Sequence, residues 1–99
     1  MTTITFKRSG GVVGNEVDLD LDTNTLPEND AQRLLQLITN ADFFNLPENL
    51  APQTTPDEFQ YTITVKAGHT SHTVHCTDTT MPAPLRLLVK ELTMLKVLH

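Results

Sequence analysis

Strict alternation of apolar and polar residues is the feature of this sequence that most constrains its fold. In 58-EFQYTITVK-66 every odd position is apolar and every even position is polar. The same alternation occurs in 16-EVDLDLD-22 and, around Ile4 and Phe6, in residues 2–8. Successive side chains of a β-strand point to opposite faces, so these segments predict strands with one buried and one solvated face.

Glycines mark the places where these strands turn. A glycine-flanked tip, 10-GGVVG-14, joins the first two strands, and Ala67-Gly68 begins a turn to a returning strand over roughly residues 71–78. Two alternating segments joined by a short glycine-containing turn are typical of a β-hairpin. The chain is therefore predicted to contain two hairpins.

An amphipathic helix is predicted after the first hairpin. The stretch 25-TLPE-28 matches a capping box, in which Thr25 and Glu28 bind free N–H groups of the first helical turn. Apolar residues then recur at helical spacing to about residue 40. They are Ala31, Leu34, Leu35 and Ile38.

A second helix is predicted after the second hairpin. Pro82 and Pro84 lie at its start, and Thr79 or Thr80 is the expected N-cap. Its apolar stripe consists of Leu85, Leu88, Val89, Leu92 and Leu95. The predicted order is thus β-β-α-β-β-α, an α+β fold with a four-stranded antiparallel sheet and two helices on one face. We expect one domain over residues 1–99.

The charge balance and the cysteine count exclude several classes of protein. Twelve acidic residues against seven basic ones give a net charge of −5, and no cluster of Lys and Arg suits a nucleic acid. A single cysteine cannot form an internal disulfide. With neither a signal-like N-terminus nor an apolar run near the ~20 residues that span a bilayer, we expect a cytoplasmic protein without membrane contact.

The stretch 67-AGHTSHTVHC-76 contains three of the four histidines and the only cysteine. On a strand, His72 shares a face with Cys76, whereas His75 points to the opposite face and His69 lies in the turn. A zinc site needs three or four converging ligands, which this arrangement does not favour. A metal-binding protein that uses the three histidines remains an alternative.

Other catalytic arrangements have little support in the sequence. Asp18, Asp20 and Asp22 share one strand face, which indicates a solvated surface rather than a desolvated acid–base pair. Ser9 and Ser71 lack the strand-to-helix turn of a hydrolase nucleophile. We therefore expect neither enzymatic activity nor a cofactor.

Strand directions place three irregular segments at one end of the sheet: 9-SGGVVG-14, 47–57 and 78-DTTMPAP-84. Val12 or Val13 could fold under the sheet edge or serve as an apolar anchor for a partner. Asp78 could cap the following helix or offer an exposed carboxylate to a cation.

Four segments of the sequence are informative in combination: 4-ITFKRSGGVVG-14, 26-LPENDAQRLLQLITNADFFNLP-47, 59-FQYTITV-65 and 78-DTTMPAPLRLL-88. Together they resemble the emfourin family of small bacterial inhibitors of thermolysin-like zinc metalloproteases. The resemblance implies a target protease with one open zinc position. It suggests that Asp78, with Thr79 beside it, places a carboxylate there, with Asp57 as the rival.

In the same hypothesis an apolar tip occupies a substrate pocket of the protease. That tip consists of Gly10, Gly11, Val12, Val13 and Gly14. A non-catalytic interaction module is the alternative function. It would dimerise through the acidic sheet face or through Leu87, Met94 and Leu98, although we expect a monomer.

Overall fold

The computed structural model describes residues 2–10, 16–50 and 58–98. The strands are β1 (Thr2–Gly10), β2 (Val17–Asp22), β3 (Phe59–Ala67) and β4 (Thr70–Thr77). The helices are α1 (Glu28–Asn40), the short 3-10 helix η1 (Phe43–Asn45) and α2 (Ala83–Leu98). This confirms the predicted β-β-α-β-β-α order and the α+β class.

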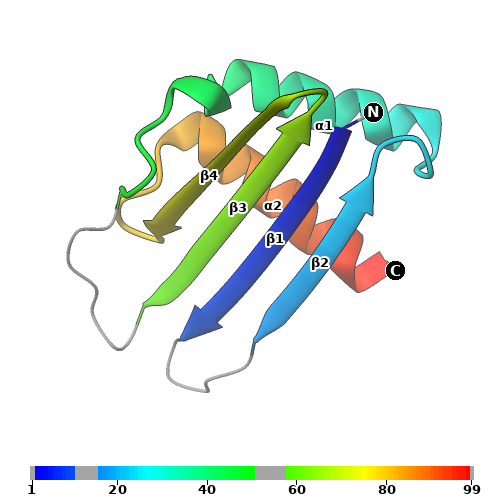
Figure 1. The fold of residues 1–99 in the computed structure, drawn as a ribbon. Helices are drawn as coiled ribbons and strands as arrows, with labels where there is room; N and C mark the ends of the chain where they lie inside the picture. The colour runs from blue at the N-terminus through cyan, green and yellow to red at the C-terminus, as the bar shows by residue number, and fades with distance from the viewer. Residues whose placement is uncertain (1, 11–15, 51–57, 99) are drawn as a thin grey trace.

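The four strands form one antiparallel sheet in the order β2-β1-β3-β4. Both long helices lie on the same face of this sheet, and the other face is uncovered (Figure 1). The register explains the layers, because it pairs Ile4 with Val65 and Phe6 with Ile63 on the covered face. All four of these side chains are buried. Because alternate residues of each strand point to the same side, the apolar residues form one face of the sheet, and the two helices pack on it.

The stripe of α2 is buried as predicted, but that of α1 is narrower than predicted. Ala31, Leu34 and Ile38 are buried, whereas Leu35 is 41% exposed. Successive helical residues are about 100° apart, so Leu35 lies beyond the narrow side that this helix turns toward the sheet. The prediction for Leu35 was wrong.

Both predicted helix caps were also wrong. α1 begins after Pro27 without a side-chain cap, and the Thr25 hydroxyl donates to the Asp22 carbonyl at 2.9 Å. α2 begins at Ala83, and the Thr80 hydroxyl accepts a hydrogen bond from the Thr77 N–H at 2.9 Å. In each case the threonine stabilises the turn that precedes the helix instead of the helix itself.

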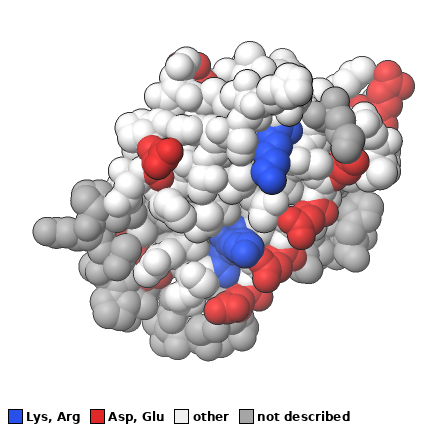
Figure 2. All heavy atoms as spheres, viewed as in Figure 1, with Lys and Arg blue, Asp and Glu red and all other residues white. Residues whose placement is uncertain are grey.

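The uncovered face of the sheet is polar and partly acidic. Asp18, Asp20 and Asp22 lie on it along β2, and the Asp20 carboxylate accepts a 3.0 Å hydrogen bond from the Thr5 hydroxyl. Figure 2 shows acidic side chains gathered over the β2 side of this face. None of the helices in the described part of the chain combines the length and apolar content needed to cross a membrane.

Candidate functional site

One end of the sheet brings together chain segments that are far apart in the sequence. Ser9 pairs with Gln60 in the β1–β3 ladder, and Gln60 pairs with Thr77 in the β3–β4 ladder. The last residues of β1 and β4 and the first residues of β3 therefore lie at the same end (Figure 1). We call this the loop end. Residues 11–14 and Asp57 lie outside the described residues.

Asp78 is the first residue after β4, and two side chains fix its position at the loop end. The Tyr61 hydroxyl donates a 2.8 Å hydrogen bond to Asp78 Oδ1. Arg86 Nη2, from the first turn of α2, donates a 2.7 Å hydrogen bond to the Asp78 carbonyl oxygen. Because α2 begins only at Ala83, Asp78 does not cap it, and the capping alternative was wrong.

The turn after β4 is held by threonines. The Thr77 hydroxyl is buried and lies 3.1 Å from the Thr80 hydroxyl and 3.4 Å from the Thr79 hydroxyl. The Thr80 N–H donates back to the Thr77 carbonyl at 3.2 Å. These bonds close the backbone around Asp78, so its carboxylate is presented from a fixed turn while Thr79 stays exposed.

Tyr61 is a stable donor to Asp78. Burial, followed by the hydrogen bond and the negative charge of Asp78, raises the pKa of its hydroxyl from 10.0 to about 12, against a lowering effect of the Arg8 charge. The hydroxyl therefore keeps its proton at neutral pH. Its ring also packs on Phe6, with 6.1 Å between centroids, which ties the site to the core.

Arg8 lies on the covered face of β1 at the loop end. It pairs with Tyr61 in the ladder, and its guanidinium carbon lies 4.5 Å from the centroid of the Phe59 ring. Neither Arg8 nor Tyr61 was predicted from the sequence as part of this site. The sequence does contain a signal for Arg8. In the strand alternation it occupies the next inward position after Ile4 and Phe6, and a charged residue is unusual there.

Gly10 ends β1 in a conformation that favours glycine. Its φ is 87°, and a Cβ at this position would lie 3.0 Å from the Glu58 carbonyl oxygen. The close approach of the β1 and β3 backbones at the loop end therefore depends on the absence of a side chain.

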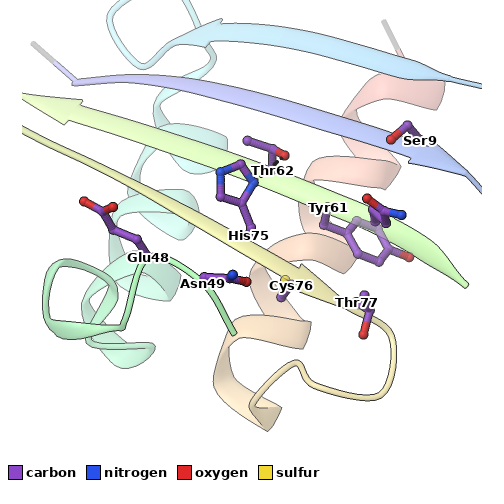
Figure 3. A pocket seen from close by; sticks show the side chains of 9 residues that line it. Ser9, Glu48, Asn49, Tyr61, Thr62, His75, Cys76 and Thr77 are labelled. Atoms are coloured by element: carbon purple, nitrogen blue, oxygen red, sulfur yellow. Dashed lines mark hydrogen bonds between the residues drawn. The ribbon is translucent and has the colours of Figure 1, made fainter. Parts of the chain in front are cut away.

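A hollow of about 260 Å³ opens at the loop end on the uncovered face of the sheet. Figure 3 shows Thr62 and His75 next to each other there, Ser9 on a neighbouring strand, and Asn49 at the β4 edge. His75 Nδ1 lies 3.0 Å from the Thr62 hydroxyl oxygen. The volume is smaller than the roughly 300–1,000 Å³ of ordinary small-molecule sites. It suits a single side chain of a partner better than a cofactor.

The edge of β4 is covered by the segment that follows η1. The His75 N–H donates to the Glu48 carbonyl at 2.7 Å, and the Leu50 N–H donates to the His75 carbonyl at 2.8 Å. Asn49 and His75 thus form a parallel bridge. This pairing fixes residues 48–50 beside the hollow and covers part of a sheet edge that would otherwise be exposed.

As the strand pattern predicted, these three histidines do not converge. His72 faces the helices, where its Nε2 lies 2.6 Å from the Leu46 carbonyl oxygen and its ring packs on Phe43. His75 lies on the opposite face. Within residues 2–10, 16–50 and 58–98, no group of three His, Cys, Asp or Glu side chains could hold a metal ion. Cys76 is buried, and burial raises its pKa to about 11.

The family model described as Emfourin matches residues 6–93, which is most of the chain. No curated protein and no solved structure matches the chain. The matched range includes Arg8, Gly10, Tyr61, Asp78 and Arg86, and so the described parts of the loop end. The chain therefore belongs to the Emfourin family, and this membership points to a role as a metalloprotease inhibitor.

Proposed function

We propose that this protein inhibits a thermolysin-like zinc metalloprotease by docking its loop end into the catalytic cleft of that enzyme. Membership of the Emfourin family supports the general role. The observation that carries the proposal is the Asp78 carboxylate, held by Tyr61 next to the ends of β1 and β3. Gly10, Asp78 and Thr79 are the described residues that would contact the target.

The Asp78 carboxylate is proposed to bind the catalytic zinc of the protease. Catalytic zinc has three protein ligands and keeps one position for water, and an incoming carboxylate oxygen can take that position. Oδ1 accepts the Tyr61 hydrogen bond, and none of the described residues donates to Oδ2. Oδ2 is thus the oxygen that is offered to the metal.

Rigidity of the turn would contribute to affinity. The bonds from Tyr61 and Arg86 hold the side chain and the backbone of Asp78 before any partner arrives. A group that is already ordered loses less conformational entropy on binding. Standard protease–inhibitor interfaces bury roughly 1,600 Å² in total, an area within reach of several loops on an 11.0 kDa protein.

The remaining contacts in the proposal fall on residues outside the described ranges. Gly11, Val12, Val13 and Gly14 would continue from Gly10 into a substrate pocket as an apolar tip. Asp57 is the rival zinc-facing carboxylate. In this proposal the protein has no catalysis of its own and acts by occupying the cleft of the enzyme.

Inhibition kinetics test the proposal directly. Titration of a thermolysin-like protease with this protein should give saturable loss of peptidase activity, and Asp78→Ala should raise the inhibition constant. Full peptidase activity in the presence of excess wild-type protein would overturn the proposed function.

A second candidate is a self-associating interaction module. Leu87 and Met94 are 58% and 48% exposed and lie seven residues apart on α2, which puts them on the same side of that helix. Light scattering distinguishes the two candidates. We expect the 11.0 kDa mass of a monomer, whereas a stable dimer lost on Leu87→Ser would favour the module.

A further inference from the structure

We infer that Arg8 is a second docking group of this protein and that it receives a carboxylate of the bound protease. The inference rests on the proposed function and extends it to a residue on the other side of Tyr61 from Asp78. Three observations carry it: the place of Arg8 in the fold, its hydrogen bonding, and its contact with Phe59.

Arg8 lies where neither helix covers the sheet. The ends of β1 and β3 extend past both helices at the loop end (Figure 1). Arg8 and Phe59 are both half-buried there, although their side chains belong to the face that the helices cover elsewhere. A partner that docks against the loop end would therefore meet this pair directly.

The hydrogen bonding of Arg8 is incomplete within the described part of the chain. Its Nε is buried and has no hydrogen-bond partner there. The two other described arginines differ, because Arg33 forms an ion pair with Glu91 at 3.6 Å and Arg86 donates to the Asp78 carbonyl. A buried donor without an acceptor destabilises the free protein, and such groups in native structures call for an explanation.

The geometry of the Arg8 guanidinium indicates which kind of acceptor would bind it. Its planar N–H donors match a carboxylate in a bidentate arrangement, and the contact with the Phe59 ring restrains the group before binding. Nε is buried in the free protein, so the guanidinium would have to turn its edge toward the partner on docking, and a carboxylate there would then supply the acceptor that the described residues lack. A nucleic-acid phosphate does not fit, since the chain carries a net charge of −5 and an acidic row along β2.

The test compares Arg8→Gln and Arg8→Lys with Arg33→Gln, a control that removes the same charge from α1, away from the loop end. Binding to thermolysin is measured by calorimetry and inhibition by peptidase assay. Arg8→Gln should weaken binding roughly tenfold or more, Arg8→Lys should fall between it and wild type, and Arg33→Gln should change binding by less than about twofold.

A measurement on the wild-type protein tests the role of Arg8 even if a variant fails to fold. The Arg8 Nε–H proton is followed by NMR, and it should shift downfield and exchange more slowly with solvent in the thermolysin complex. Wild-type binding with an unchanged Nε–H signal and an unaffected Arg8→Gln affinity would overturn the role of Arg8 alone. Failure of the wild type to bind would overturn the proposed function, and this inference with it.

Discussion

The Tyr61 hydroxyl donates a 2.8 Å hydrogen bond to Asp78 Oδ1, across the ends of β3 and β4. Tyr61 is almost fully buried, whereas Asp78 is half-buried at the surface. The bond thus joins a rigid core aromatic to a carboxylate that a partner can reach.

Tyr61→Phe removes this hydrogen bond and keeps the ring. Loss of a hydrogen bond to a charged group should lower the free energy of unfolding by about 1–3 kcal/mol, measured by urea denaturation. Inhibition should weaken as well, because Asp78 is then held by fewer contacts. An inhibition constant equal to that of wild type would show that positioning by Tyr61 is unnecessary.

The stability should decline at alkaline pH because two buried groups resist deprotonation. The pKa of Tyr61 rises from 10.0 to about 12 and that of Cys76 from 9.0 to about 11, in both cases chiefly through burial. Each group is neutral when protonated, so its contribution is complete below the unfolded-state pKa and is lost as pH rises through the folded-state value. Stability should therefore fall between about pH 9 and pH 12.

Urea denaturation across this range measures the effect, and Cys76→Ala is the control. This variant should lose the part of the decline that begins near pH 9 and keep the part that begins near pH 10. A wild-type stability that stays constant up to pH 12 would contradict the burial of these two groups.

Adjacent leucines on α2 test which side of the helix is packed. Leu88 is fully buried, whereas Leu87 is 58% exposed. Leu88→Ala should reduce the free energy of unfolding by roughly 2–5 kcal/mol, and Leu87→Ala should change it by less than about 0.5 kcal/mol. Equal losses in the two variants would mean that the orientation of α2 is wrong.

Two glycines with positive φ form another matched pair. Ala at either position pays a strain of roughly 1–2 kcal/mol for the left-handed conformation. At Gly10 the new Cβ also meets the Glu58 carbonyl oxygen at 3.0 Å, whereas at Gly68 nothing lies within 4 Å. Gly10→Ala should therefore be the more destabilising change in urea denaturation, and it alone should weaken inhibition, because Gly68 lies in the β3–β4 turn.

Much of the fold could be predicted from the sequence because alternation and helical spacing report which side of each element is buried. Ile4, Phe6 and Ile63 are buried where period two places them, and His72 and His75 are split across the sheet. The caps were wrong because threonine hydroxyls can bond to preceding backbone groups as well as to helix N–H groups: Thr25 donates to the Asp22 carbonyl, and Thr80 accepts from the Thr77 N–H. Local motifs do not decide between these two uses.

The candidate site was predictable only in part. Strand directions placed Gly10 and Asp78 at the same end, since antiparallel neighbours bring alternate strand ends together. The contacts of Asp78 with Tyr61 and Arg86 depend on side chains that meet across 17 and eight residues of sequence. Neither the period of a strand nor that of a helix predicts such contacts, and the same holds for the contact of Arg8 with the Phe59 ring.

The inhibition constant of Asp78→Asn against a thermolysin-like protease tests the central claim most directly. Asn keeps the size of the side chain and an acceptor for Tyr61, and it removes only the negative charge offered to zinc. Asp20→Asn on the uncovered face is the matched control, and Asp57→Asn tests the rival carboxylate. We predict a rise of roughly 100-fold for Asp78→Asn and less than about twofold for Asp20→Asn. An Asp78→Asn protein that inhibits as well as wild type would contradict the assignment of Asp78 to the zinc.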